Sequence, residues 1–250
     1  MPPDGPRGPQ GPDRPDGPAD RTGRGDRGPQ DGYPRFALAG LDAVAISPHP
    51  GARPRRLALA LHGYGGDCTE LLPAALAWRP LLADTELVLA EAPAPCAINK
   101  QKREWFPLTS RRDILRVHIV EAARKVRALL DELIATRELS RHDVALVGFS
   151  QGAMLALHVG LAAGVRAIAA FSGLLTSAAE LGTGAPPPVF VAHGGRDRMV
   201  KPDDALAIAT RLTAAGGDVT LHLEGELAHA VSDAGRRAAG RFLRDHLAPG

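Results

Sequence analysis

The sequence Gly148-Phe149-Ser150-Gln151-Gly152 lies between the apolar run Val144–Val147 and the helix-like stretch Ala153–Leu161. A strand that turns abruptly into a helix brings its backbone segments close together, and a glycine on each side of the turn removes side chains that would clash. The serine at the tip of such a turn is exposed above the edge of the sheet. A chance Gly-x-Ser-x-Gly in a chain rich in Ala and Gly is the alternative, but its place between strand and helix favours a nucleophilic serine.

Outward from this turn, short apolar runs alternate with longer segments of helical period. The runs have the length of strands, and several are continuously apolar, which is typical of strands buried on both faces. This alternation predicts an α/β fold, with a mainly parallel central sheet flanked by helices and functional sites at the carboxyl ends of the strands. The expected strands are Asp42–Ile46, Arg56–His62, Glu86–Ala92, Asp143–Phe149, Ala167–Phe171, Pro188–His193 and Asp218–Leu223. The expected helices are Thr69–Leu82, Ser110–Thr136, Ala153–Leu161, Pro202–Ala215 and Ser232–His246.

Residues 1–34 differ from the rest of the chain in composition. They contain nine Pro, eight Gly, five Arg and six Asp, with Met1, Ala19 and Tyr33 as their only apolar side chains. Such a segment buries too little apolar surface to offset the entropy of ordering it. We therefore predict a disordered tail over residues 1–34 and a single folded domain over residues 35–250. The tail also lacks the apolar stretch of a signal peptide.

Composition excludes several classes of partner. The formal net charge is +2 and the charges are interspersed, so we expect no nucleic-acid partner. No window has the uninterrupted apolar length of a membrane span, so we expect no stable membrane insertion. Cys68 and Cys96 are too few for a disulfide framework or a metal cluster, which indicates a reduced compartment, the cytoplasm. Nothing near either thiol in the sequence indicates a lowered pKa.

A glycine-rich loop, Leu61-His62-Gly63-Tyr64-Gly65-Gly66-Asp67, directly follows one of the expected strands. Acyl transfer builds negative charge on a carbonyl oxygen, and backbone N–H groups held in place stabilise that charge. We expect one such donor from Gln151, the residue after the serine, and the other from Tyr64. The loop has neither of the glycine spacings of phosphate-binding loops.

The acid of a catalytic triad is expected in a loop after Ser150. A serine becomes nucleophilic when a histidine accepts its proton and a carboxylate orients that histidine, and the chain order at this kind of turn is serine, acid, histidine. Asp197 follows the expected strand Pro188–His193, whereas Asp203 and Asp204 open the next helix, where the helix dipole favours carboxylates. We therefore predict Asp197 as the acid.

His229 is the predicted base. It lies in the loop between the last expected strand and the last expected helix. The other candidates have positions typical of structural residues: His193 ends a strand, His222 lies within one, and His246 lies on the terminal helix. His62 comes too early for the required chain order, so we expect it to be structural.

Together these motifs resemble the phospholipase/carboxylesterase branch of the α/β-hydrolases, which includes the acyl-protein thioesterases. The resemblance implies an α/β-hydrolase fold, a Ser150-Asp197-His229 triad, and an oxyanion hole from Tyr64 and Gln151. This sequence departs from the family pattern at Ala228, where Gly is common, and at Pro107, where Asp is frequent. The matching segments are Leu61–Asp67, Trp105-Phe106, Gly148–Gly152, His193–Asp197 and His229.

Trp105 is the candidate substrate-binding residue. Its neighbours Arg103, Glu104 and Pro107 indicate an exposed loop, where a large aromatic side chain can wall a pocket for an acyl chain. A tryptophan that caps the core is the alternative.

The expected activity is that of a serine carboxylic-ester hydrolase that uses an acyl-enzyme and neither a metal nor a cofactor. The segment Ser172–Pro188 is too short for a large lid, and an open site suits small or medium-chain esters or thioesters. Because fold and triad do not fix the substrate, a lysophospholipase, acyl-protein thioesterase, peptidase, lactonase or acyltransferase is an alternative. An inactive α/β-hydrolase used as a binding module is another, although the intact Ser, Asp and His argue against it.

Overall fold

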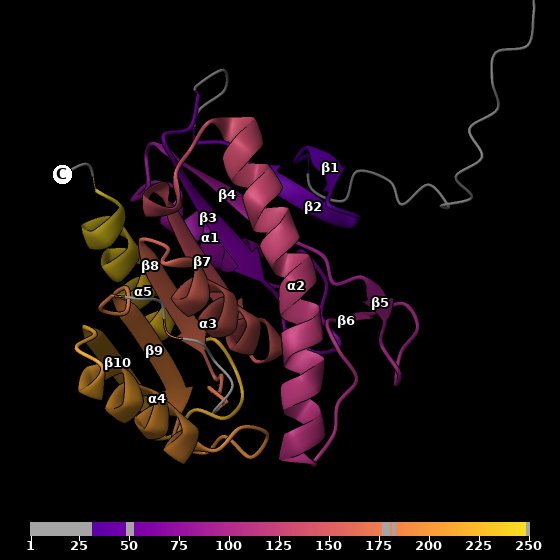
Figure 1. Cartoon of the computed structure of the whole chain (residues 1–250), viewed down its shortest axis with the longest axis vertical. Coiled ribbons are helices and arrows are strands. Elements are labelled where there is room, and N and C mark those ends of the chain that lie inside the picture. Colours follow the sequence, from indigo (N-terminus) through magenta and orange to yellow (C-terminus); the bar gives the residue numbers. More distant parts are fainter. Residues whose placement is uncertain (1–31, 49–52, 177–180, 182–183, 249–250) are drawn as a thin grey trace, which may run out of the picture. The chain divides into compact units, whose positions relative to one another are not determined.

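The structure, a computed structural model, describes residues 32–48, 53–176, 181 and 184–248 (Figure 1). The predicted tail, residues 1–34, lies outside the described residues up to position 31. The boundary between tail and domain therefore stays a prediction. The first strand begins at Arg35.

An eight-stranded sheet forms the centre of the described domain. Its order is β1-β2-β4-β3-β7-β8-β9-β10, and every pair from β4 to β10 is parallel. The predicted α/β architecture with a mainly parallel sheet is confirmed. The bounds are Arg35–Leu38 (β1), Leu41–Ile46 (β2), Arg56–Leu61 (β3), Thr85–Ala90 (β4), Val144–Phe149 (β7), Ala167–Phe171 (β8), Val189–Gly194 (β9) and Val219–Glu224 (β10).

Three antiparallel strand pairs were not predicted, and one of them joins β2 to β4. β1 and β2 form a hairpin at the sheet edge, where Ala39 and Gly40 both have positive φ, as a tight two-residue hairpin turn requires. β5 (Ala94–Pro95) and β6 (Arg103–Glu104) form a separate two-stranded sheet. These strands are too short for alternation to be recognised in the sequence.

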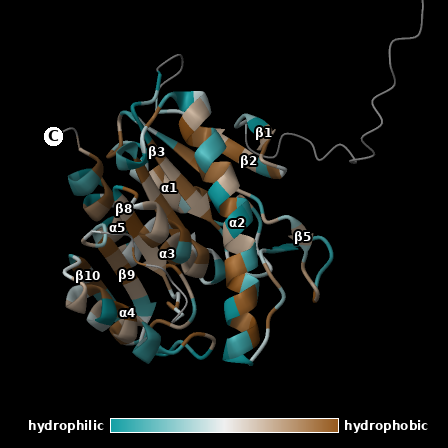
Figure 2. Ribbon diagram, in the orientation of Figure 1, coloured by the Kyte–Doolittle hydropathy of each residue, from teal (hydrophilic) through white to brown (hydrophobic). Residues whose placement is uncertain are grey.

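Helices cover both faces of the sheet. The side chains of α2, α3 and α4 share one buried cluster with the sheet, while those of α1 and α5 share another on the opposite face (Figure 1). Figure 2 shows hydrophobic residues concentrated on the strands, whereas α2 and α5 carry both hydrophobic and hydrophilic residues. The bounds are Leu72–Trp78 (α1), Arg112–Arg137 (α2), Gln151–Ala163 (α3), Pro202–Ala214 (α4) and Asp233–Leu247 (α5), with a short 3-10 helix, η1, at Arg141–Asp143.

α1 is shorter than the predicted helix Thr69–Leu82. Pro73 stands in its first turn, where a residue with a fixed φ and no N–H group is favoured, and Pro80 follows its end. The indole N–H of Trp78 donates to Arg236 O, which ties α1 to α5 across their shared face of the sheet.

Candidate active site

The turn between β7 and α3 places Ser150 at the carboxyl edge of the sheet. Its backbone has φ 52° and ψ −114°, an unusual conformation for a residue with a side chain, and its N–H donates to Phe171 O on β8 at 2.9 Å. A Cβ on Gly148 would overlap the backbone of Gly152, and a Cβ on Gly152 would overlap Leu61 O of β3. The two glycines therefore let the turn fit between neighbouring strands.

Ser150, His229 and Asp197 form a hydrogen-bonded chain. Ser150 Oγ lies 2.9 Å from His229 Nε2, and His229 Nδ1 lies 2.7 Å from Asp197 Oδ2. Because a carboxylate only accepts, Nδ1 carries the hydrogen that faces Asp197, which leaves Nε2 to accept the serine hydroxyl. Three elements supply these residues, and the structure brings the three predicted residues together.

Asp197 is 5% exposed, and its loop holds it as a carboxylate. The N–H groups of Met199 and Val200 donate to Oδ1 at 2.8 and 3.0 Å. Burial alone would raise the pKa of Asp197, but the hydrogen bonds from His229, Val200 and Met199 lower it below its usual value. Asp204, which the sequence placed in a helix, lies in the first turn of α4 and pairs with Arg112.

Close backbone contact joins the loops after β9 and β10. A Cβ on Gly194 would overlap the carbonyl oxygens of Leu227 and Ala228, and Gly195 lies against Gly225. The N–H of Arg196 donates to Leu227 O at 2.9 Å. These glycines allow the loops that carry Asp197 and His229 to pack directly together.

The glycine-rich loop after β3 lies beside the nucleophile turn, as expected. Gly63 N–H donates to Glu70 Oε2 at 2.6 Å, and Gly65 N–H donates to Arg103 O at 2.9 Å. Among the described residues, no backbone hydrogen bond outside the helices and strands uses the N–H of Tyr64 or Gln151. Neither N–H group therefore has a backbone acceptor of that kind among the described residues.

Glu70 was not singled out from the sequence. Burial raises the pKa of Glu70 above its usual value, although the hydrogen bond from the Gly63 N–H acts in the opposite direction. The carboxyl also interacts electrostatically with His229. No local motif distinguishes it from any other helix-flanking Glu.

His62 is structural, as expected. It is 2% exposed, its Nδ1 lies 2.7 Å from Gly63 O, and its Nε2 accepts from Ala92 N–H at 3.0 Å. Burial lowers the pKa of His62.

The expectation that Trp105 lies exposed is wrong. Trp105 is 5% exposed, its indole N–H donates to His62 O at 2.9 Å, and its backbone N–H donates to Gln151 Oε1 at 3.1 Å. The Gln151 side chain also donates to Phe106 O at 2.8 Å. The Trp105-Phe106 segment is thus tied to the residue after the nucleophile. Long-range contacts of this kind outweigh the polar character of the neighbouring sequence. Trp105 nevertheless borders a cavity of about 280 Å³ between this segment and α2.

The two cysteines are free and buried, and their pKa values shift in opposite directions. Burial raises the pKa of Cys68 to about 12. Burial would also raise the pKa of Cys96, but the Tyr64 hydroxyl and two backbone N–H groups lower it overall, contrary to expectation. The same contact raises the pKa of Tyr64 to about 12.

The other histidines considered as the base occupy their predicted elements, with one unexpected contact. His222 lies on β10 beside Glu224, and His246 lies on α5. His193, at the end of β9, lies 3.3 Å from Asp197 Oδ2 through its Nε2. His193 and Asp197 are four residues apart in the sequence. Because β9 ends at Gly194, between them, this spacing alone did not indicate a contact.

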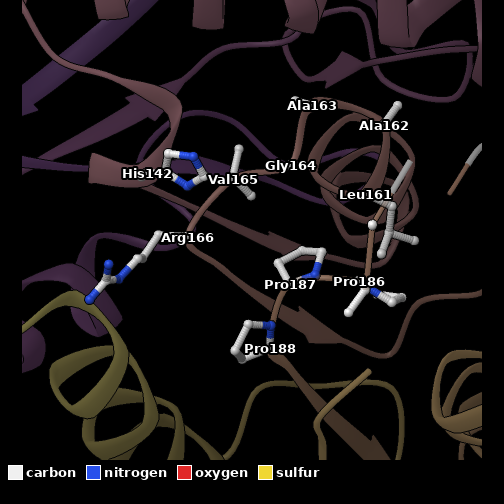
Figure 3. A pocket seen from close by; sticks show the side chains of 12 residues that line it. His142, Leu161, Ala162, Ala163, Gly164, Val165, Arg166, Pro186, Pro187 and Pro188 are labelled. Carbon is white, nitrogen blue, oxygen red and sulfur yellow. The ribbon is translucent and has the colours of Figure 1, made fainter. Parts of the chain in front are cut away.

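A larger cavity lies away from Ser150. It measures about 470 Å³ and is bordered by the end of α3, Arg166 before β8, and Pro186–Pro188 before β9 (Figure 3). It therefore lies at the amino ends of the strands, whereas Ser150 lies at the carboxyl ends.

The described residues include no cluster of His, Cys, Asp and Glu that could hold a metal ion. None of the described helices combines the length and apolar character needed to cross a bilayer.

The fold and this site define a hydrolase of the α/β-hydrolase superfamily. Residues 44–247 match the Phospholipase/Carboxylesterase family, and the chain belongs to that family.

Two esterases are the relatives that bear on activity. The chain is 30% identical to Esterase YpfH of Escherichia coli (strain K12) over 207 residues, which cover 77% of this chain and 82% of that protein. The crystal structure of esterase PE8 shares 34% identity at a TM-score of 0.77, covering 83% of this chain and 99% of that chain. A carboxylesterase from Mesorhizobium loti shares the fold at a TM-score of 0.69, with 20% identity over 85% of this chain and 99% of that chain. The chain is an esterase-type hydrolase.

Proposed function

We propose that this protein hydrolyses small or medium-chain carboxylic esters or thioesters through an acyl-enzyme on Ser150. The observation that carries the proposal is the chain of hydrogen bonds from Ser150 through His229 to Asp197. A hydroxyl, a base and an orienting carboxylate in this arrangement are what acyl transfer requires.

In the first half-reaction, Ser150 Oγ attacks the carbonyl carbon while its proton passes to His229 Nε2. The carbonyl oxygen becomes negative and accepts hydrogen bonds from the N–H groups of Tyr64 and Gln151. When the tetrahedral intermediate collapses, the bond to the leaving group breaks and the leaving alcohol or thiol takes the proton from His229. Asp197 stays ionised and stabilises the imidazolium in between.

In the second half-reaction, water replaces the leaving group. His229 accepts a proton from the water, and the oxygen attacks the acyl carbon on Ser150. Collapse releases the carboxylic acid and returns the proton to Ser150 Oγ.

We infer that Trp105 helps to bind the acyl chain from its place beside the cavity near α2. Phe106, Pro93 and Ala122 give the cavity an apolar side that suits a short hydrocarbon chain. Its other side is polar, with Glu104, His118, Glu121 and Lys125.

Replacement of Trp105 by Phe is expected to lower kcat/KM progressively as the acyl chain lengthens, with acetate esters little changed. Phe keeps an aromatic wall but removes apolar area and the N–H donor to His62 O. Each methylene that loses contact costs at most roughly 0.8 kcal/mol. The measurement is kcat/KM for p-nitrophenyl esters from two to ten carbons, with melting temperature recorded alongside. Parallel loss at every chain length would show that Trp105 only supports the core.

The proposed activity is tested with a fluorophosphonate probe and a panel of p-nitrophenyl esters and acyl thioesters. Stoichiometric labelling of wild type at Ser150, located by peptide mass spectrometry, and turnover of part of the panel are expected. A folded protein that neither reacts with the probe nor turns over any panel member would be a binding module instead.

A further inference from the structure

A second histidine contacts the proposed catalytic acid. His193 is 1% exposed at the end of β9, and its Nε2 lies 3.0 Å from Val200 O and 3.3 Å from Asp197 Oδ2. The side chains of His193 and Asp197 are both 0% exposed. Because both neighbouring oxygens only accept, Nε2 carries the hydrogen; it donates to Val200 O, and Nε2 also lies close to Asp197 Oδ2.

The other ring nitrogen of His193 has no partner within the described part of the chain. His193 Nδ1 and the Ser172 hydroxyl are both buried without a hydrogen bond. Burying polar atoms without partners is costly, and an apolar side chain of similar size would fill this space without that cost. Packing alone therefore does not explain why a histidine occupies this position, whereas the contacts of its Nε2 do.

His193 bridges the two ends of the turn that carries the acid. Asp197 and Val200 begin and end this turn, and the Val200 N–H already donates to Asp197 Oδ1. The hydrogen bond from Nε2 to Val200 O ties this turn to the sheet, because His193 belongs to a buried parallel strand. Asp197 Oδ2 thus lies between two imidazoles, at 2.7 Å from His229 and 3.3 Å from His193.

We propose that His193 is a positioning residue of the triad: its Nε2–H, bonded to Val200 O, holds the turn whose Val200 N–H binds Asp197, and its imidazole lies beside the charge on Oδ2. The proposal rests on the proposed role of Asp197 as the catalytic acid. Without the His193 ring, Oδ2 contacts only the imidazole of His229. The carboxylate then stabilises the protonated form of His229 more strongly. The acid limb of the pH profile then moves to higher pH.

Few other charged side chains lie near His193, Asp197 and His229. Glu70 interacts electrostatically with His229 from the side of the glycine-rich loop. Within the described residues, no ion pair joins His193 to a charged group other than Asp197. A shift of the acid limb on replacing His193 therefore reports the contact with Asp197.

Two amide variants of His193 distinguish a role of the nitrogen at the Nε2 position from a role in packing. Gln places its amide nitrogen near the position of the histidine Nε2, and Asn places it near Nδ1. His193→Gln is expected to keep kcat/KM within about threefold of wild type, whereas His193→Asn is expected to lose about tenfold or more. The acid limb of the kcat/KM profile is expected to shift upward by about 0.5 pH unit in the Asn variant only.

The measurements are kcat/KM for one p-nitrophenyl ester from pH 5 to 9, the rate of fluorophosphonate labelling over the same range, and the melting temperature. His158→Gln is the matched control, because His158 is also buried, at 6% exposed, and bonds Thr176 rather than the triad. It is expected to leave the pH profile unchanged. The labelled fraction corrects each rate for any variant that is incompletely folded.

Equal losses in the Gln and Asn variants, or an unshifted acid limb in the Asn variant, would overturn the role of His193. Failure of the proposed triad is recognised separately: in that case Asp197→Asn itself would retain wild-type kcat. A strong effect of Asp197→Asn with no difference among the His193 variants rejects only the further inference.

Discussion

Ser150→Ala and His229→Ala are each expected to lower kcat by roughly 10⁶-fold, and Asp197→Asn by roughly 10⁴-fold. The Ser150 Oγ–His229 Nε2 distance of 2.9 Å and the His229 Nδ1–Asp197 Oδ2 distance of 2.7 Å make the three groups act as a unit. Double variants should therefore be scarcely slower than the worse single variant. Residual activity would come from the N–H donors at Tyr64 and Gln151.

The matched control for the acid is Asp204→Asn, because Asp204 lies in the first turn of α4 and bonds Arg112 instead of a histidine. Near-wild-type kcat is expected from it. Single-turnover kinetics and burst amplitude with a p-nitrophenyl ester measure the chemical step. If Asp204→Asn proved more damaging than Asp197→Asn, the assignment of the acid would be wrong.

Gly152→Ala is expected to remove activity and to lower the melting temperature by about 10 °C. The new Cβ would overlap Leu61 O and C and lie 2.7 Å from His62 O, all of them backbone atoms in β3 and the glycine-rich loop. Relief requires α3 to move away from the sheet, which separates Gln151 from Tyr64. Overpacking of this kind costs about 3 kcal/mol, and each kcal/mol lowers the melting temperature of a domain of this size by roughly 2–4 °C.

Gly184→Ala is the control for this substitution, since a Cβ at that position meets no atom of the described residues within 4 Å, its chain neighbours aside. It should change neither melting temperature nor kcat/KM. Thermal unfolding followed by circular dichroism, together with fluorophosphonate labelling, checks both variants. An active Gly152→Ala protein with wild-type stability would contradict the close packing of this turn.

The sequence was sufficient for the elements whose signals are local. Buried parallel strands are continuously apolar, so β3, β4, β7 and β8 were recognisable without tertiary information. The turn at Ser150 was recognisable because its geometry excludes side chains at Gly148 and Gly152.

Features that depend on distant contacts could not be predicted. Trp105 has polar neighbours in sequence, but its burial depends on His62 and Gln151, 43 and 46 residues away. The contacts of His193 with Asp197 and Val200 depend on how the loop after β9 folds back on its own strand. Residue type gave no indication of either contact.

The edge position of β10 makes enzyme activity a sensitive measure of local opening of the sheet. β10 is the edge strand and consists of exposed and half-buried residues, while the strands nearer the centre are buried. The loop that carries His229 follows β10 and lies 79 residues beyond Ser150. Local opening is easiest where few apolar contacts hold an element. Fraying of this edge would withdraw the base while most helices and strands persist. Inactivation would then precede the loss of secondary structure on heating, and cooling would restore the activity without global refolding.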